Sequence, residues 1–559
     1  MVGQAFIMLI LGLHGGFTIN QHDAAACLIS DGKIAVAIEE ERVSRVKSPR
    51  GVMPTNAIRY CLGCTGIKIE QIDRVAISGD TYGKSFRDKL SNYLLHWFGY
   101  APEIDIINHQ RAHIYSSWAF MGLNQSQDIS NYCFISSDAY GDSLSSSIYT
   151  FDKSLTPACH HTNNSSNSLG MFYSAITSIC GFRPSLDEYK LMGLAPYGST
   201  LDSGLTKQME IYFSQYVKSD DAQGYIIDNS ILNSSIATTD EPFYNVCSDL
   251  RSKARLWGND FDSKSIAIAF AAQTIFEKAL TSYLLLAYKL TGKRNYILTG
   301  GAALNCAATL ALRNLEFVDE LQIPPCASDR GLAIGSAVGC LVANTNQFPM
   351  TDSPYLGKSY GIADVKEILE LLQISFVELP DPEKHAAKLL SQGFVIGWFQ
   401  GKAETGARAL GNRSILASPL ISDMKAIVNK KIKFREGYRP FAPSVTAEDA
   451  DKYFMGCTSD TSPYMTHVFK VRNEYLDKLP SVTHIDETAR VHTVTSAKNP
   501  VFYKLLKSFE SITGVPVLLN TSFNIADQPI VETPREAISV YFSTGLDYLF
   551  IGNLLISKT

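Results

Sequence analysis

The sequence has no apolar run near its start that is long enough to cross a membrane. Residues 5–13 form an apolar run of about nine residues, whereas a transmembrane helix needs roughly 20. No cationic residue precedes this run, as one would in a secretory signal peptide. The run is therefore predicted to be a buried strand, and no membrane partner is expected.

A regular cysteine pattern is also missing. The 11 cysteines are odd in number and scattered, with a single CxxC at Cys61 and Cys64 and no second pair at zinc-site spacing. Such a pattern indicates reduced thiols rather than a disulfide framework. We therefore expect a cytoplasmic enzyme.

Neither sign of charge dominates the chain as a whole. It has 50 Lys and Arg against 55 Asp and Glu, a formal net charge of −5, which disfavours nucleic acid as a partner. Its hydrophobic content of 45% is that of an ordinary globular protein. With 559 residues the chain exceeds the roughly 250–300 residues at which single cores stop growing. Two or more domains are therefore predicted.

Cations nevertheless gather in one stretch, residues 395–444. Between Lys402 and Arg439 nine cations stand against three acids, a local charge of +6. Glycines lie among them, and glycine lets backbone N–H groups approach a ligand while guanidinium groups bind phosphate or carboxylate through two hydrogen bonds. Apolar residues such as Trp398 and Phe441 are threaded through the same stretch, and a solvated basic face, the alternative, would lack them. The stretch predicts an anion site.

Two parts of the chain follow the same plan of strand, glycine loop and strand. Residues 7–14 are apolar and lead into Gly15-Gly16, and two further apolar runs are joined by Asp31-Gly32, a strong hairpin signal. Residues 133–137 then lead into the acidic loop DAYGD and a strand at 146–151. Each unit resembles the start of a nucleotide-binding lobe in the superfamily of actin, hexokinase and Hsp70. Two such units indicate duplicated lobes.

Candidate ligand residues occur in helices and loops of the same half. His109 and His113 are four residues apart in a predicted helix, 106–118, and share a face that could bind one metal ion, with two surface histidines as the alternative. Gly300 and Gly301 separate a predicted strand, 296–299, from a helix starting near Cys306, so they either offer N–H groups to a phosphate or form a tight turn. Lys190 lies in a loop-rich stretch that could line a cleft.

Other segments are predicted mainly from periodicity. Helices are expected at 55–62, 85–95, 265–290, 332–342, 365–372 and 385–390, and a strand at 317–323. Residues 199–262 are polar and irregular and are predicted to be an insertion, while 343–360 are a connection between domains. Near the end of the chain an apolar strand is followed by Asn520, Thr521, Ser522 and Asn524, more hydrogen-bonding residues than a turn requires.

Several motifs resemble, in order, those of the ATP-dependent O-carbamoyltransferases of antibiotic, toxin and nodulation-factor biosynthesis. In the first half these are HDAAA, EEERVSR, HQRAH, GGAALN and SDRGLAIGSA. In the second half they are GWFQGKAETGARALGNRSIL, REGYRPFAPS, DETARVHTV and TGVPVLLNTSFNIADQPIV. The resemblance covers nearly the whole chain except residues 199–262.

The resemblance implies an α/β protein with two domains. Residues 1–350 would form an actin-like domain with duplicated lobes, close to the tRNA threonylcarbamoyladenosine synthase, in which the carbamoyl group is transferred. Residues 351–385 would connect it to a YrdC-like domain, 386–559, in which carbamoyl adenylate is formed. In this family carbamoyl phosphate is hydrolysed to carbamate, ATP adenylates the carbamate with release of pyrophosphate, and the carbamoyl group passes to an acceptor hydroxyl.

The resemblance also assigns residues by matching motif. Carbamoyl phosphate and the adenylate would be held by Arg408, Lys433, Arg439, Arg490, Asn520 and Ser522, with Arg408 and Arg439 as catalytic cations. Adenosine would lie at Gly300, Gly301 and Asn305, with Lys190 nearby. His22 of HDAAA would be the base for the acceptor, and otherwise a structural histidine that caps its loop. His14 is a nearby alternative.

A metal site is implied at His109, His113, Asp138 and Asp329. Two imidazoles with carboxylates suit Fe²⁺, Mn²⁺ or Zn²⁺, of which Fe²⁺ is expected, while Mg²⁺ prefers oxygen ligands and is expected with ATP. The chain departs from the family pattern at three places, with DAYGD for DGxGD, DETAR for DGTAR, and Asp527-Gln528 for Gly-Glu. The changes at Ala139 and Glu487 bear on the geometry of their loops, and none of the three removes a cation or a proposed ligand.

Two other functions are open at this point. An actin-like small-molecule kinase would explain ATP and the glycine loops, but it would leave the +6 stretch and NTSFN unused and would release ADP instead of pyrophosphate. A non-catalytic scaffold of the tRNA-modification type would show no turnover. The acceptor, expected to be a hydroxyl of a secondary metabolite, would be shaped by loops near 42–47, 82–100 and 199–262. The oligomeric state stays open, with a homodimer as one option.

Overall fold

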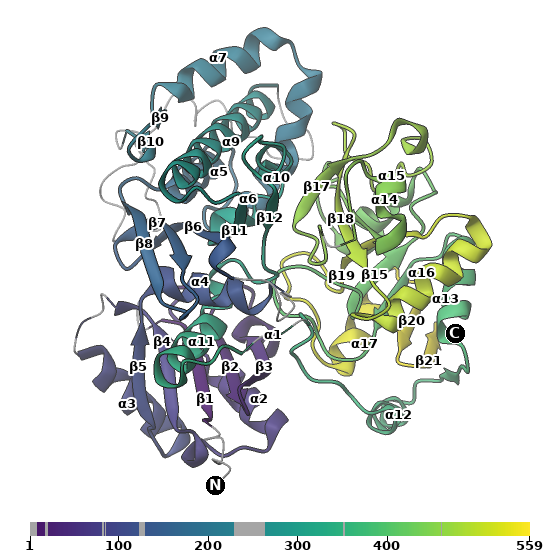
Figure 1. Ribbon diagram of the computed structural model, residues 1–559. Coiled ribbons are helices and arrows are strands. Elements are labelled where there is room, and N and C mark those ends of the chain that lie inside the picture. Colours follow the sequence, from purple (N-terminus) through teal and green to yellow (C-terminus); the bar gives the residue numbers. More distant parts are fainter. Residues whose placement is uncertain are drawn as a thin grey trace. The chain divides into compact units, whose positions relative to one another are not determined.

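The computed structural model describes residues 8–16, 21–80, 83, 85–121, 129–228, 263–349, 351, 353–459 and 461–558. The chain is mixed α/β and divides into two compact units (Figure 1). Unit 1 comprises Met1–Ser78, Lys84–Ile106 and Arg330–Thr559, and unit 2 comprises Gly79–Gly83 and Ile107–Asp329. The first half of the chain is thus shared between both units, whereas the whole second half belongs to unit 1.

The first sheet, in unit 1, has five strands in the order β3-β2-β1-β4-β5. These are β1 (Ile10–His14), β2 (Ala25–Ser30), β3 (Lys33–Glu39), β4 (Arg74–Ser78) and β5 (Glu103–Ile107). β1 pairs antiparallel with β2 and parallel with β4, and β2 pairs antiparallel with β3. Helix α11 (Leu332–Thr345) packs directly on β1, because a Cβ at Gly12 would lie 2.0 Å from the carbonyl oxygen of Ala333. Helices α1 (Glu40–Ser44), α2 (Thr55–Thr65) and α3 (Ser85–Phe98) complete this part.

The second sheet, in unit 2, repeats the plan of the first. Its order is β12-β11-β6-β7-β8, and its strands are β6 (Tyr132–Gly141), β7 (Leu144–Phe151), β8 (Pro157–Asn164), β11 (Asn295–Thr299) and β12 (Glu320–Gln322). β6, β7 and β8 pair antiparallel in sequence, and β11 pairs parallel with β6. The repeat predicted from the two strand, glycine loop and strand units is therefore confirmed as a repeat of sheet topology.

The helices of unit 2 include part of the predicted insertion. They are α4 (His109–Ala119), α5 (Leu169–Ile179), α6 (Glu188–Leu194), α7 (Ser203–Ser214), α9 (Ser263–Thr291) and α10 (Ala308–Leu312). The prediction that 199–262 is irregular was wrong for its first part, where α7 and the hairpin of β9 (Val217–Asp220) and β10 (Gly224–Ile227) pack on α9. Met209, Phe213 and Tyr225 supply buried side chains for that packing. Residues 229–262 lie outside the described residues.

The second half of the chain is built on a nine-stranded sheet with the order β13-β21-β20-β14-β15-β19-β16-β18-β17. The strands are β13 (Val377–Glu378), β14 (Ile396–Phe399), β15 (Arg413–Ala417), β16 (Ala442–Thr446), β17 (His467–Lys470), β18 (Thr488–Val494), β19 (Val517–Ser522), β20 (Tyr548–Ile551) and β21 (Leu554–Ser557). The helices are α12 (Ile362–Leu371), α13 (Pro382–Ser391), α14 (Met424–Val428), α15 (Ala450–Tyr453), α16 (Pro500–Thr513) and α17 (Pro534–Ser543). Two buried apolar clusters form its core, one around Phe399 and Leu519 and the other around Trp398 and Phe502.

Two predicted helices begin later in the chain than expected. The helix predicted at 106–118 begins only at His109, because β5 runs to Ile107 and the side chain of Asn108 caps the helix by accepting from the N–H of Arg111. The helix predicted near Cys306 is preceded by a 3-10 turn, Gly301–Leu304, and begins at Ala308. Among the described residues, no helix is both long and apolar enough to span a membrane.

Candidate functional site

Lys433 is the centre of the cationic stretch in the second half of the chain. It ends a π-helical turn, Asn429–Lys433, and its side chain is buried. Its ammonium lies within hydrogen-bond distance of four oxygens, Ser522 O (2.8 Å), Ser522 Oγ (3.2 Å), Asn524 O (3.0 Å) and Asn524 Oδ1 (2.6 Å). Burial lowers the pKa of Lys433 well below its usual value, and nearby cations lower it further. An anionic ligand would offset both effects.

Asn520 joins three strands next to this lysine. It pairs with Leu416 on β15 and Ala442 on β16. Its Nδ2 donates to Ala409 O at 3.1 Å and to Ser444 Oγ at 2.9 Å. Its Oδ1 is buried with no hydrogen-bond partner among the described residues, so it is available to a ligand donor.

Arg490 lies on the neighbouring strand, β18, two residues before His492 and on the same face. Ser444 Oγ lies 2.9 Å from Nδ1 of His492, which ties this face to Asn520. Nε of Arg490 is buried without a hydrogen-bond partner in the described part of the chain. Burial also lowers the pKa of His492 to about 3, so its imidazole stays neutral.

Arg408 and Arg439 are placed by loops at the edge of the same sheet. Arg408 directly precedes Ala409, whose carbonyl accepts from Asn520. Arg439 precedes β16 by three residues and forms an ion pair with Glu436 at 3.4 Å. Arg439 also contributes to the lowered pKa of Lys433. The structure thus brings the predicted anion ligands together on β19, β18 and the segments leading to β15 and β16.

Lys47 is a cation near this site that sequence reasoning did not assign to it. It comes from the first part of the chain, within unit 1, and is half-buried. Burial lowers its pKa, and Arg330 and Arg439 add to that effect while Glu41 opposes it. The signal in the sequence was its place at the end of EEERVSRVK, a motif whose role the resemblance did not specify.

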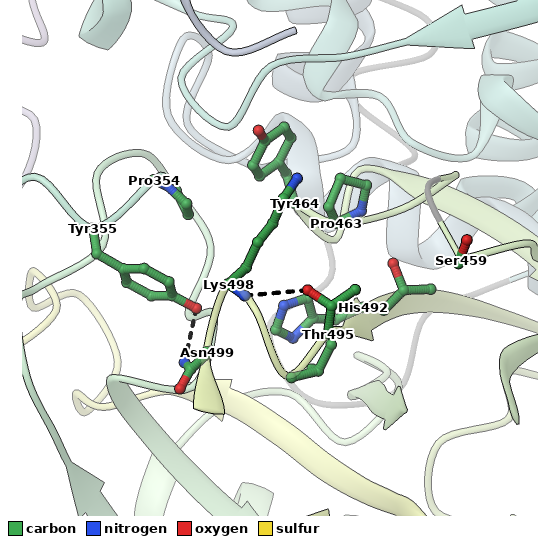
Figure 2. A pocket seen from close by; sticks show the side chains of 11 residues that line it. Pro354, Tyr355, Ser459, Pro463, Tyr464, His492, Thr495, Lys498 and Asn499 are labelled. Atoms are coloured by element: carbon green, nitrogen blue, oxygen red, sulfur yellow. Dashed lines mark hydrogen bonds between the residues drawn. The ribbon is translucent and has the colours of Figure 1, made fainter. Parts of the chain in front are cut away.

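A small cavity lies beside β18, lined by Tyr355, Tyr464, His492, Lys498 and Asn499 among others (Figure 2). Its volume of about 20 Å³ is enough for about one water molecule. The Asn499 amide donates to Tyr355 Oη at 2.8 Å, and the Lys498 N–H donates to Thr495 Oγ1 at 3.3 Å. The cavity is therefore too small to be a substrate pocket as it stands.

Two departures from the family motifs occur where the backbone favours glycine. Glu487, in DETAR, has a φ of +64°, and Asp527, before Gln528, has a φ of +59°. The left-handed region costs a residue with a Cβ about 1–2 kcal/mol. The loops therefore keep the backbone that glycine would adopt, and the strain resides in the substituted residues. Ala139, the third departure, is absent from the positive-φ residues of the described chain.

His22, the predicted base, lies in unit 1 with about a third of its side chain exposed. Its Nδ1 is 3.4 Å from Oδ2 of Asp23, and Oδ1 of Asp23 forms an ion pair with Arg330 at 3.3 Å. His14, the alternative, is buried, and its ring nitrogens lie 2.9 Å from Ser78 Oγ and 3.1 Å from the backbone oxygen of His22. His14 therefore supports the loop, whereas His22 is the more exposed of the two histidines.

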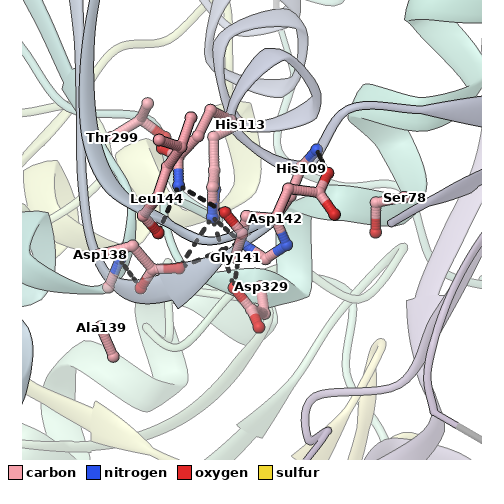
Figure 3. Close-up of polar contacts among 12 residues, drawn as sticks. Ser78, His109, His113, Asp138, Ala139, Gly141, Asp142, Leu144, Thr299 and Asp329 are labelled. Carbon is pink, nitrogen blue, oxygen red and sulfur yellow. Dashed lines mark hydrogen bonds and ion pairs between the residues drawn. The ribbon is translucent and has the colours of Figure 1, made fainter. Parts of the chain in front are cut away.

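A second group of predicted ligands converges in unit 2. His109 and His113 project from α4 toward the carboxylates of Asp138, at the end of β6, and Asp329 (Figure 3). Oδ2 of Asp138 is 3.2 Å from Nε2 of each histidine, and Oδ1 of Asp329 is 3.6 Å from His109 and 3.4 Å from His113. One ligand atom from each of the four lies within 4.8 Å of the others. This donor set and spacing fit a divalent metal ion.

The charges in this group are strongly linked. Burial works to lower the pKa of His113, but its hydrogen bonds to Asp138 and Asp329 outweigh this and raise that pKa to about 9. Burial likewise works to raise the pKa of Asp138, but hydrogen bonds to the two histidines hold it at about 2. Buried carboxylates here thus require a positive charge between them, which a metal ion would also supply.

The DAYGD segment sets the position of His109. It was predicted to be a loop after a strand at 133–137, but β6 continues through Gly141 and Asp142 lies in the turn to β7. Oδ2 of Asp142 accepts from the N–H of His109 at 2.6 Å and from Nδ2 of Asn108 at 3.2 Å, so it anchors the start of α4. A Cβ at Gly141 would lie 2.1 Å from the His109 ring, which requires glycine at this position. The acidic glycine loop is thus a support for the histidines.

The predicted adenosine residues adjoin this group. Gly300 has a φ of +86°, and a Cβ there would lie 2.2 Å from Ser137 O. The N–H of Gly301 donates to Asp138 Oδ1 at 3.0 Å, and that of Gly300 donates to Ala327 O at 2.9 Å. The expectation that these N–H groups are free for a phosphate was wrong, because the protein itself accepts from both. Their role in binding adenosine stays a prediction.

Asn305 and Lys190 are held by side chains of unit 2. Asn305 exchanges two amide hydrogen bonds with Gln273 of α9, at 2.9 and 3.0 Å. Lys190, on α6, lies 3.6 Å from Oδ2 of Asp187. Met192 of the same helix contacts Cys306, next to Asn305. Both residues therefore lie around one part of α9 and α6.

Comparison with known proteins identifies the class. The family model described as "Carbamoyltransferase N-terminus" matches residues 10–95 and 77–338, and "Carbamoyltransferase C-terminus" matches residues 387–558. The chain therefore belongs to the carbamoyltransferase family and is an enzyme of that class. The first match runs through residues 199–262, so the expectation that this stretch lies outside the family was wrong.

Relatives named as nodulation proteins support this assignment. The chain is 31% identical to nodulation protein NolNO of Sinorhizobium fredii, over 99% of this chain and 83% of that protein. It is 33% identical to nodulation protein NolO of Bradyrhizobium diazoefficiens, over 81% of this chain and 79% of that protein. An uncharacterized Synechocystis protein is 30% identical over 97% of this chain and 96% of its own length.

The similarity to solved structures is more distant. Component A of the (R)-2-hydroxyglutaryl-CoA dehydratase of Acidaminococcus fermentans is 16% identical, with a TM-score of 0.34, over 59% of this chain and 96% of that one. This likeness is too weak to define the fold.

Proposed function

We propose that the enzyme transfers a carbamoyl group from carbamoyl phosphate to a hydroxyl of a small natural product, at the expense of ATP. Water would cleave carbamoyl phosphate to carbamate and phosphate. Carbamate oxygen would attack the α-phosphorus of ATP, giving carbamoyl adenylate and pyrophosphate. The acceptor hydroxyl would then attack the carbamoyl carbon, AMP would leave, and the hydroxyl proton would pass to a base.

The observation that carries this proposal is the cationic site around Lys433. A buried ammonium is held by Ser522 and Asn524, and Oδ1 of Asn520 and Nε of Arg490 are buried without a hydrogen-bond partner among the described residues. No carboxylate of the described residues pairs with Lys433. Preorganised cations and donors of this kind stabilise the charge that develops on phosphoryl oxygens. This supports Arg408, Lys433, Arg439, Arg490, Asn520 and Ser522 as ligands of carbamoyl phosphate and the adenylate.

His22 is proposed as the base for the acceptor. The Asp23 carboxylate, 3.4 Å from Nδ1 of His22, would orient the imidazole that takes the hydroxyl proton, as in other base and carboxylate pairs. The ion pair of Asp23 with Arg330 holds that carboxylate in place. Acceptors would include secondary metabolites with a free hydroxyl.

A divalent metal ion, Fe²⁺ or alternatively Mn²⁺ or Zn²⁺, is proposed at His109, His113, Asp138 and Asp329. When bound there, it would act as a Lewis acid toward phosphate or hydroxyl oxygens. Gly300, Gly301, Asn305 and Lys190 are proposed to bind the nucleotide nearby, with Mg²⁺ on its phosphates. The actin-like assignment of the two repeated sheets is supported by their shared 3-2-1-4-5 order. The YrdC-like assignment of residues 386–559 is proposed from the motifs alone.

The test is to incubate the full-length enzyme with ATP and carbamoyl phosphate and to measure pyrophosphate and ADP separately. Pyrophosphate release and exchange of labelled pyrophosphate into ATP, both dependent on carbamoyl phosphate, are expected, and ADP would indicate a kinase instead. Lys433→Met should abolish the exchange, while Lys430→Met, which removes an exposed cation three residues away, should retain it. Equal activity of both variants would contradict the site. Candidate acceptors can be screened by mass spectrometry for the gain of one carbamoyl group.

A further inference from the structure

Two residues from the start of the chain hold a peptide in the cationic stretch of the second half. Oε1 of Glu39, at the end of β3, accepts from the N–H of Gly406 at 2.6 Å and lies 3.4 Å from Thr405 Oγ1. Nη2 of Arg42, on α1, donates to Gly406 O at 2.8 Å and to Glu404 O at 3.4 Å. Both polar groups of Gly406 are therefore bound by charged side chains. All of these residues belong to unit 1.

This contact is buried. Glu39 is 2% exposed and Arg42 1% exposed, and the two side chains lie 3.7 Å apart as an ion pair. Hydrogen bonds with a charged partner are roughly twice as strong as neutral ones, and burial strengthens them. Gly406 has a φ of +91°, a backbone conformation that glycine adopts without strain. The peptide is thus fixed in both position and orientation.

The segment that follows Gly406 carries Arg408 and is fixed again just beyond it. Oε1 of Glu404 accepts from the N–H groups of Leu410 (2.6 Å), Asn412 (3.4 Å) and Arg413 (3.2 Å). Ala409 O accepts from Asn520. Arg408 therefore lies between two fixed points, one supplied by its own loop and the other by Glu39 and Arg42.

The same short segment also contacts the loop of His22. Glu41, between Glu39 and Arg42, forms an ion pair with Arg330 at 3.4 Å, and Arg330 pairs with Asp23 at 3.3 Å. One helical turn thus contacts the surroundings of the proposed base on one side and the loop of Arg408 on the other.

We propose that Glu39 and Arg42 are positioning residues for adenylation, because they hold the Gly406 peptide and thereby the guanidinium of Arg408. This inference rests on the proposed function. It places part of the support for carbamoyl adenylate formation in the first half of the chain, although every proposed anion ligand lies beyond Lys402. It also makes residues 39–42 the link between the activation and transfer sites.

The test uses full-length Glu39→Gln and measures exchange of labelled pyrophosphate into ATP as a function of carbamoyl phosphate. No acceptor is needed, so transfer does not enter the result. A neutral amide offers a weaker acceptor to Gly406, and kcat/KM for carbamoyl phosphate is expected to fall roughly 10- to 10²-fold, the range for a displaced catalytic group. Arg42→Lys, which keeps the charge but replaces the planar guanidinium with a single ammonium, should show a partial loss, and Arg42→Ala a larger one.

Two variants control for loss of fold and of packing. Glu40→Gln removes a buried carboxylate from the same turn, and this carboxylate accepts from the Asn56 side chain and the N–H of Ala57, at 2.7 Å each, both in the first half of the chain. Arg45→Ala removes bonds to Ile530 O (2.7 Å) and Pro529 O (2.9 Å) in the second half and one to the backbone oxygen of Arg42 (3.4 Å), but none to the Gly406 peptide. Both should keep exchange within about twofold of the wild type, as expected of residues without contact to the Arg408 loop.

Hydrogen–deuterium exchange gives a readout that a general structural role would not change. In Glu39→Gln, peptides covering residues 404–411 should exchange faster while those covering 425–433 stay unchanged. If residues 404–411 of Glu39→Gln exchanged hydrogen at the wild-type rate, this inference would be overturned but the proposed function would not. Equal losses of activity in Glu39→Gln, Glu40→Gln and Arg45→Ala would have the same meaning. A wild type without pyrophosphate exchange would overturn the proposed function, and the positioning role with it.

Discussion

One oxygen of Asp138 accepts a hydrogen bond from the N–H of Gly301 at 3.0 Å, while the other lies 3.2 Å from Nε2 of both His109 and His113. A single carboxylate thus touches both the candidate metal ligands and the loop predicted to hold adenosine. The glycine loop and the metal group are therefore parts of one site in unit 2.

Removing one imidazole should remove the metal ion. His113→Ala takes away a fully buried ligand, and loss of bound metal, measured by elemental analysis of the purified protein, is expected because three donors hold an ion much less tightly than four. Dialysis of the wild type against a chelator should lower its thermal midpoint.

His160→Ala is the matched control, since His160 lies on β8, outside the group of candidate ligands, and its Nε2 lies 2.7 Å from Thr150 Oγ1. It should keep the wild-type metal content. Full occupancy in His113→Ala would show that the histidines do not hold the ion.

One variant should lose only the transfer of the carbamoyl group, and another should lose its activation as well. His22→Asn should still release phosphate and pyrophosphate but lose roughly 10²–10⁴-fold in carbamoylated product, the range typical of losing a general base. Arg439→Ala should lose pyrophosphate release and carbamoylated product together. A missing charge-assisted contact slows the formation of carbamoyl adenylate, and the transfer step then lacks its substrate. Both products are measured in the same reaction.

His14→Asn serves as the comparison for His22, because His14 is buried and supports the same loop. It should lower thermal stability more than His22→Asn does. If His22→Asn abolishes pyrophosphate release as strongly as Arg439→Ala, His22 belongs to adenylation or to the fold instead of to transfer.

Glu532 should make stability depend on pH near neutrality. It is buried, accepts from the Tyr60 hydroxyl, and burial raises its pKa to about 7. Between these two pKa values the folded chain keeps a proton on Glu532 that the unfolded chain releases. The stabilisation of the folded state by this proton is therefore complete below the unfolded pKa of 4.5 and is lost as pH rises through about 7. Glu532→Gln should flatten the pH dependence of the free energy of unfolding between pH 5 and 8 by roughly 3 kcal/mol.

Urea denaturation at several pH values would measure this effect. Tyr60→Phe keeps the carboxylate but removes a hydrogen bond that lowers its pKa, so the pH dependence should persist with a midpoint shifted upward. Identical slopes in the wild type and Glu532→Gln would show that Glu532 ionises normally.

Glycine should stabilise the two positions where this chain departs from the family motif at positive φ. Glu487→Gly and Asp527→Gly relieve a left-handed backbone worth about 1–2 kcal/mol but add about 0.4–1 kcal/mol of unfolded-chain entropy. A net gain of roughly 0.5–1 kcal/mol is expected from these two opposing terms, measured by urea denaturation.

Glu367→Gly in helix α12 is the opposite case, and it should lose roughly 1 kcal/mol because glycine is unfavourable in helices. If Glu487→Gly lost as much stability as Glu367→Gly, the Glu487 side chain would contribute more to stability than its left-handed backbone costs.

Local patterns in the sequence were enough for the parts of the fold that depend on neighbouring residues. The two apolar runs and the Asp-Gly turn signal at 24–39 predicted β2, the turn and β3, because turn chemistry acts over a few residues. The four-residue spacing of His109 and His113 placed both imidazoles on one helix face for the same reason. The repeat of strand and glycine loop likewise predicted two similar sheets.

The resemblance to carbamoyltransferases, and not spacing, implied that Asp138 and Asp329 join those histidines. No local pattern could do so, since the carboxylates come from β6 and from a turn after β12. Residues 203–227 show the limit of composition, because a polar stretch became helix and hairpin once Met209 and Phe213 could pack on α9.

The sequence by itself thus determined the hairpin of β2 and β3, the shared helix face of His109 and His113, and the site of excess positive charge, all of which follow from residues close together in the chain. Only the tertiary structure decided that Glu39 and Arg42 bind Gly406 and that Lys47 approaches Arg439. The residues in these contacts are more than 300 positions apart. They meet because sheet register brings their segments together and because a buried charged side chain binds a peptide group there. Neither leaves a periodic signal along the chain.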